Sequence, residues 1–151
     1  MRRLLLPFVA VLLLAACGSE PPQVTFAADT ASVVARPTQY CDLQLTDCTA
    51  DPAAPVTLPV APGTPLQVTV PDEIAQTPWQ VVFSYRDANG TQTDERSPVF
   101  AAGERSTWTL QLAATDGLVT AEVQQYGVPQ FNPETGQAEF AIRASWVLNV
   151  G

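Results

Sequence analysis

The side chains that could carry out chemistry in this chain are almost all carboxylates. The 151 residues contain fifteen Asp and Glu and seven Arg, but no Lys and no His. Without His, no Ser–His or Cys–His pair can form, and without Lys there is no Schiff base or Ser–Lys dyad. Carboxylate-dependent hydrolysis is the catalytic alternative that remains. The composition therefore predicts a protein that is not an enzyme and that has no cofactor.

Two acidic segments could still act in catalysis or metal binding. Asp72 and Glu73 are adjacent, but neighbours in an extended strand point to opposite faces, so the pair is interpreted as a polar turn. Asp87, Asn89 and Thr91 place oxygen-bearing side chains at alternate positions, yet the glycine and distal glutamate of a full calcium loop are missing. A hairpin turn is preferred there, and no metal site is predicted.

The first sixteen residues are typical of an export signal. Arg2 and Arg3 supply the positive end, and residues 4–14 form an apolar run that ends in small residues before Cys17. As a helix this run rises only about 16 Å, roughly half of the ~30 Å hydrocarbon core, so a membrane span is not expected. Residues 1–16 are predicted to be a signal peptide that is removed.

Leu14-Ala15-Ala16-Cys17 resembles the lipobox of bacterial lipoproteins. The resemblance implies that the thiol of Cys17 takes a diacylglyceryl group and that cleavage before it frees an amine for a further acyl chain. Two or more chains give the stable attachment that one chain does not. We expect lipid on Cys17 to hold the protein on the outer face of the cytoplasmic membrane, with residues 17–22 as lipidated cysteine and short tether. The alternative is ordinary cleavage and release of a soluble protein.

The two later cysteines are predicted to form a disulfide. With Cys17 assigned to lipid, Cys41 and Cys48 remain as an even pair in an oxidising compartment. Closing this short loop contributes roughly 2–3 kcal/mol. Two thiols without His fall short of the four ligands of structural zinc, and a redox pair would be expected at C-x-x-C spacing.

The elements that must position these residues are predicted to be β-strands, because apolar and polar residues alternate almost everywhere after the tether. The predicted inner-face residues are Val24, Phe26, Val56, Leu58, Val60, Leu66, Val68, Val70, Trp79, Val81, Phe83, Tyr85, Trp108, Leu110, Leu112, Phe140, Ile142, Ala144, Trp146, Leu148 and Val150. A more polar strand over residues 118–126 is expected near an edge, and residues 71–78 have room for one helical turn.

This pattern predicts an all-β domain over residues 23–151, with two antiparallel sheets packed as a sandwich; a closed barrel is the alternative. Trp79 opens a mid-chain strand, which favours an immunoglobulin-like arrangement. Cys41 and Cys48 lie too close in sequence to be the intersheet bridge of antibody domains.

Several segments give the chain a family resemblance. These segments are Arg36-Pro-Thr-Gln-Tyr-Cys41 with Cys48, Val70-Pro-Asp-Glu, Thr77-Pro-Trp-Gln-Val-Val-Phe83, Ser97-Pro-Val-Phe100, Ala121-Glu-Val-Gln-Gln-Tyr126 and Ser145-Trp-Val-Leu148. In them the chain resembles a group of small actinobacterial lipoproteins that is catalogued only as a domain of unknown function. The resemblance implies an envelope location and no particular activity.

The expected function is therefore non-catalytic binding or scaffolding at the cell envelope. After removal of the leader, five Arg face fifteen acidic residues, a formal charge of −10 that repels nucleic acid. The membrane, through lipid on Cys17, and an unidentified envelope protein or ligand are the expected partners. One alternative is a carrier or sensor whose aromatic residues line a cavity for an apolar ligand between the sheets. The other is a carboxylate-dependent hydrolase.

Overall fold

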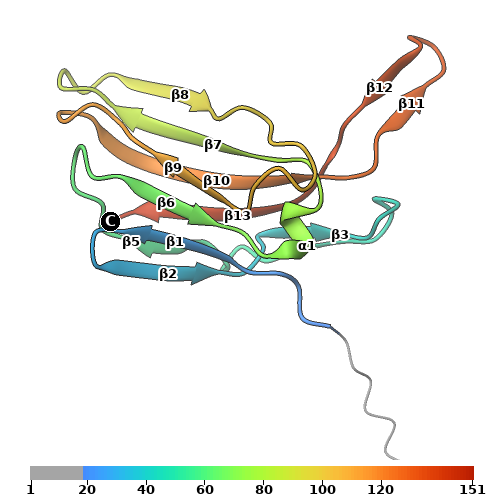
Figure 1. The fold of residues 1–151 in the computed structure, drawn as a ribbon, viewed down its shortest axis with the longest axis horizontal. Coiled ribbons are helices and arrows are strands. Elements are labelled where there is room, and N and C mark those ends of the chain that lie inside the picture. The colour runs from blue at the N-terminus through green and yellow to red at the C-terminus, as the bar shows by residue number, and fades with distance from the viewer. Residues whose placement is uncertain (1–18) are drawn as a thin grey trace, which may run out of the picture.

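The computed structural model describes residues 19–151, whose two main β-sheets pack face to face (Figure 1). The leader and Cys17 lie outside the described residues. Apart from one short helix, the regular elements are strands, and all but one of the strand pairs are antiparallel. The prediction of an all-β fold built from antiparallel sheets is confirmed.

The smaller sheet has four strands in the order β2-β1-β6-β9. Its strands are β1 (Val24–Ala28), β2 (Ala31–Ala35), β6 (Leu66–Thr69) and β9 (Thr107–Leu110). Burial alternates along β1 and β6, where Val24, Phe26, Leu66 and Val68 are buried and the residues between them are not. The period of two read from the sequence therefore places one face of this sheet in the core.

The larger sheet has seven strands, in the order β4-β3-β13-β10-β7-β8 with β5 beside β13. These strands are β3 (Gln39–Cys41), β4 (Cys48–Ala50), β5 (Val56–Leu58), β7 (Trp79–Arg86), β8 (Gln92–Arg96), β10 (Gly117–Tyr126) and β13 (Ile142–Val150). One edge of β13 has two partners. Its first half pairs with β3 at Ala144 and Ser145, and its last three residues pair in parallel with β5.

Two elements lie at one end of the sandwich. The helix α1 (Asp72–Ala75) is the single helical turn expected before Trp79. The hairpin of β11 (Gln130–Asn132) and β12 (Gln137–Glu139) forms a separate two-stranded sheet and extends away from the body of the molecule (Figure 1).

The core is filled by residues from both sheets and is built around two tryptophans. Trp79 and Trp146 are both fully buried. The indole N–H of Trp146 donates to the carbonyl of Pro22 (2.9 Å), and that of Trp79 donates to the carbonyl of Arg105 (3.2 Å). Each ring can therefore be buried without leaving its polar atom unpaired.

Two expectations about position were wrong. Residues 118–126 form β10, which lies between β7 and β13 in the middle of the sheet. Thr120, Glu122 and Gln124 lie half-buried on the outer side of this central strand, whereas Gln125 is buried, with its amide donating to the carbonyl of Glu73 and to the Thr77 hydroxyl. Phe140 and Ile142, both expected on the inner face of the final strand, are 52% and 38% exposed, because this strand begins only at Ile142. Trp108 is half-buried against the core on the edge strand β9.

Candidate functional site

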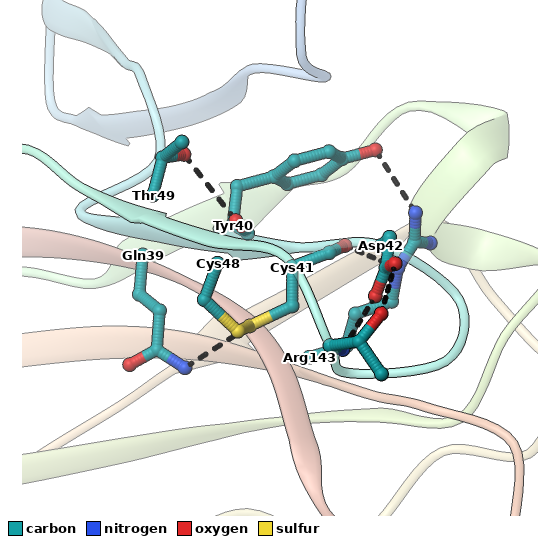
Figure 2. Close-up of a disulfide and its surroundings, with 8 residues drawn as sticks. Gln39, Tyr40, Cys41, Asp42, Cys48, Thr49 and Arg143 are labelled. Carbon is teal, nitrogen blue, oxygen red and sulfur yellow. Dashed lines mark hydrogen bonds between the residues drawn. A yellow bond between two sulfur atoms is a disulfide. The ribbon is translucent and has the colours of Figure 1, made fainter.

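The structure joins Cys41 to Cys48 in a disulfide, as predicted (Figure 2). The two cysteines face each other at the end of the β3–β4 hairpin, with an S–S distance of 2.01 Å. Cys41 is buried, whereas Cys48 is exposed. The bond therefore ties an exposed six-residue loop to a strand whose inner face belongs to the core.

Asp42 organises the loop that the disulfide closes. One carboxylate oxygen accepts a hydrogen bond from the backbone N–H of Thr46 (2.8 Å) and the other accepts one from its hydroxyl (2.7 Å). The side-chain bond from Thr46, followed by the backbone bond, lowers the pKa of Asp42 below its ordinary value of 3.8. This carboxylate is occupied in holding the loop, so we assign it no other role.

Arg143 holds the base of the same hairpin against the final strand (Figure 2). Its Nε donates to the carbonyl of Cys41 (3.0 Å), and one terminal nitrogen donates to the Tyr40 hydroxyl (3.2 Å). The guanidinium carbon also lies 5.0 Å from the centre of the Tyr40 ring. Arg143 therefore attaches β3 to the final strand beside the disulfide.

The carboxylates singled out in the sequence do not come together. Asp72 and Glu73 begin α1 and are exposed, rather than lying in an extended strand. Asp87 accepts hydrogen bonds from the N–H groups of Asn89 and Thr91 (2.8 and 2.9 Å) and so shapes the turn between β7 and β8. The preferred interpretation of this segment as a hairpin turn is confirmed. Across residues 19–151, no three His, Cys, Asp or Glu residues gather closely enough to hold a metal ion.

A shallow hollow on the outer face of the larger sheet does contain carboxylates. It has a volume of about 320 Å³ and its lining includes Asp94, Glu95 and Glu122. Glu95 accepts a hydrogen bond from the Tyr85 hydroxyl (3.1 Å), and this bond raises the pKa of Tyr85 above 10.0. Glu122 accepts one from the Gln124 amide (3.2 Å). This hollow brings together carboxylates of the kind that the hydrolase alternative requires.

Exposed apolar side chains gather at the end of the sandwich from which the β11–β12 hairpin extends. We call the set formed by Leu43, Val99, Val128, Phe131, Phe140 and Ile142 the apolar end. These residues come from the disulfide loop, the β8–β9 connection, the hairpin and the start of β13. Among the described residues, the other exposed large hydrophobic side chain is Val34. Such a concentration marks an interaction surface more often than scattered exposed residues do.

An open groove of about 540 Å³ runs through the apolar end. Its lining is mostly apolar and consists of Pro78, Val99, Ala101, Tyr126 and Phe140. The Phe140 ring meets Tyr126 edge-on at 6.3 Å. A smaller hollow of about 200 Å³ lies on the other side of Pro78 and Tyr126, toward Leu43. An apolar ligand could therefore bind in this groove without entering the buried core between the two sheets.

Sequence reasoning did not find the apolar end. No strand is predicted between residues 126 and 140, because the apolar residues there show no strand period, and Phe140 is predicted to lie on the inner face of the final strand. Val128 and Phe131 could have indicated this surface, because they are apolar residues in a polar, turn-rich segment. No predicted strand there would bury them in the core. The predicted lipidation site, Cys17, lies outside the described residues, and no helix within them is long and apolar enough to cross a membrane.

A family model described as "Protein of unknown function (DUF2771)" matches residues 18–150, nearly the whole chain. The chain belongs to the DUF2771 family. The predicted resemblance to a domain of unknown function is thereby confirmed. No curated protein and no solved structure was found to match this DUF2771 protein.

Proposed function

We propose that this DUF2771 protein is a lipid-anchored, extracytoplasmic member of the cell envelope that acts by binding or scaffolding rather than by catalysis. Its lipobox-like segment ends at Cys17, and the other two thiols are joined in a disulfide. That pairing supports Cys17 as the free thiol available for lipid. A disulfide is also compatible with an oxidising compartment outside the cytoplasm. The resemblance to actinobacterial lipoproteins supports the same assignment.

We further propose that the sandwich is immunoglobulin-like. The order β1-β6-β9 facing β8-β7-β10-β13 corresponds to strands A-B-E facing C′-C-F-G of that fold. Trp79, fully buried on the strand equivalent to C, occupies the position of the core tryptophan of such domains. Folds of this kind commonly present binding surfaces at their ends.

The observation that carries the binding role is the apolar end. Phe131 is 70% exposed and Val128 is 62% exposed, and both lie outside the core that stabilises the sandwich. Leaving such side chains in water has no structural benefit, because a buried phenylalanine contributes about 1.5–3 kcal/mol relative to an exposed one. A partner that covers them would recover this free energy.

The groove at this end makes an apolar-ligand carrier the second candidate. Its volume of about 540 Å³ falls within the range of small-molecule sites. It is open to solvent, however, and is located beside the sandwich core instead of inside it. A carrier would bind its ligand stoichiometrically, which native mass spectrometry of the purified protein would detect as added mass.

The anchor is tested by replacing Cys17. We expect Cys17→Ser to abolish acyl mass on the intact protein, measured by mass spectrometry, and to prevent its recovery as a processed membrane protein. The Cys41→Ser/Cys48→Ser double variant is the matched control, because it removes two thiols and should keep the lipid. Wild-type protein without acyl mass on Cys17 would refute the lipid anchor.

A further inference from the structure

We propose that the apolar end rests on the outer leaflet of the membrane that carries the anchor. The inference depends on the proposed lipid on Cys17, and it identifies lipid as the partner of the apolar end. It would make the domain an oriented module, with one end on the bilayer and the other displayed outward.

The position of the N-terminal segment supports this orientation. In Figure 1 the described chain enters the sandwich from the same side that bears α1, the β3 hairpin and the β11–β12 hairpin, whereas the C-terminus lies at the opposite end. Pro22 is held to the body of the domain by the indole of Trp146 (2.9 Å). Pro22 is therefore a fixed point of the domain, five residues after Cys17 in the sequence.

The length of this tether keeps the apolar end near the lipid. Five fully extended residues span at most about 16–18 Å. Pro22 must then stay within that distance of an anchored Cys17, so the side of the sandwich from which the tether leaves faces the bilayer. The two hairpins extend from that side and are the parts best placed to meet the membrane first (Figure 1).

The side chains on the two hairpins have the chemistry of an interfacial contact. Phe131 lies on β11 and Leu43 in the disulfide loop, where they are 70% and 57% exposed. Transfer of apolar surface out of water contributes about 25 cal/mol per Å². The disulfide and the Asp42–Thr46 hydrogen bonds restrict the loop, so Leu43 loses less conformational freedom when it binds.

The charges of this end indicate that the contact is apolar and not electrostatic. Asp42, Asp47, Glu134 and Glu139 lie on the same two hairpins, and Arg143 is at the base of one of them. Anionic headgroups repel such a surface, unlike a polybasic membrane-binding segment. We therefore expect the apolar end to lie closer to zwitterionic lipid than to anionic lipid. On anionic lipid, a higher salt concentration should bring it closer, because salt screens the repulsion.

The experiment uses the full lipidated protein reconstituted into phosphatidylcholine vesicles. An environment-sensitive nitrobenzoxadiazole label is attached at Phe131→Cys or at Leu43→Cys, and vesicle association is measured separately by flotation. Ala88→Cys is the matched control, because Ala88 is exposed in the β7–β8 turn at the opposite end. We expect a blue shift and increased emission at positions 131 and 43 but not at 88, with a smaller change when phosphatidylglycerol replaces part of the phosphatidylcholine.

The outcomes separate the docking from the anchor. Flotation without a spectral change at 131 and 43 would overturn the docking and leave the anchor in place. Failure to float would overturn the anchor and the docking with it. If the emission change at positions 131 and 43 depends on the protein-to-lipid ratio, the apolar end contacts a second copy of the protein. If the emission changes in native membranes but not in vesicles, the apolar end contacts a protein partner. Either result would overturn the lipid contact.

Discussion

A single carboxylate organises the most constrained loop of this protein. Asp42 accepts two hydrogen bonds from Thr46, and its backbone N–H donates to the carbonyl of Asp47 (2.9 Å). Leu45 adopts a left-handed conformation, with φ of 59°, so that the chain can turn between them. Because the carboxylate is hydrogen-bonded only in the folded protein, its titration is linked to the stability of the fold.

The first prediction concerns Thr46→Val, which removes the hydroxyl but keeps the backbone N–H. We expect the pKa of Asp42, followed by NMR, to rise toward its ordinary value of 3.8, because the largest cause of its lowering is lost. In the wild type, the stabilisation from this carboxylate is present above pH 3.8 and is lost as the pH falls through the lower folded value. The variant should therefore lose part of this acid-dependent stabilisation.

Thr49→Val is the control for that measurement. The Thr49 hydroxyl donates to the carbonyl of Tyr40 (3.3 Å) and not to a carboxylate. This substitution should leave the titration of Asp42 unchanged. An equal change in both variants would show that Thr46 acts through general loop stability.

At the scale of elements, two connections pack against each other at the end opposite α1. Gly63, between β5 and β6, has a φ of 71°, and a β-carbon added there would lie only 2.7 Å from the Cα of Ala114, between β9 and β10. The N–H of Gly63 donates to the backbone carbonyl of Asp116 (3.2 Å), and the carbonyl of Gly63 accepts from the Gln111 amide (2.9 Å). The glycine is needed both for its conformation and for this close approach.

Gly63→Ala and Gly136→Ala separate these two requirements. Both glycines have φ near 70°, but a β-carbon at Gly136, in the β11–β12 turn, would meet nothing within 4 Å. We expect Gly136→Ala to show only the conformational cost of about 1–2 kcal/mol. This cost enters the measured free energy of unfolding if the β11–β12 turn unfolds together with the sandwich. Gly63→Ala should lower the free energy of unfolding, measured in urea, by a clearly larger amount. Equal losses would contradict the close contact with Ala114.

At the scale of the whole molecule, the sandwich and the β11–β12 hairpin are separable parts. Buried core residues come from both main sheets, and none lies between positions 128 and 140. The N–H of Gly127 donates to the carbonyl of Ala141 (2.9 Å) and closes the base of this excursion. The edge-on contact of Phe140 with Tyr126 is the aromatic contact that joins the two parts.

We therefore predict that replacing residues 128–140 with Asn-Gly preserves the sandwich. The two-residue turn suits the hydrogen-bonded pair at the base. The free energy of unfolding, followed by fluorescence of the buried tryptophans, should fall by no more than about 1.5 kcal/mol, the contribution of an aromatic pair. A much larger loss would mean that the hairpin stabilises the sandwich.

Much of the fold could be predicted because one buried face per strand leaves a period of two in the sequence. The inner residues of β1 and β6 followed this rule, as did the central inner residues of β7 and β13, whereas Ile142 at the start of β13 is exposed. The missed strands have no such period. β8, with the sequence Gln-Thr-Asp-Glu-Arg, is an exposed edge strand whose charges discourage pairing with another chain. β3 and β4 have only three residues each, too few for a periodic signal.

The sequence by itself determined the all-β class, the pairing of Cys41 with Cys48 and the scarcity of catalytic side chains, because these follow from composition, local period and close spacing. Only the tertiary structure decided that β10 is central, that Phe140 is exposed, and that exposed apolar side chains from four separate segments lie at one end of the sandwich. The physical reason is that polarity along a strand reports which face meets solvent, whereas strand order and clustering depend on contacts between residues far apart in the chain.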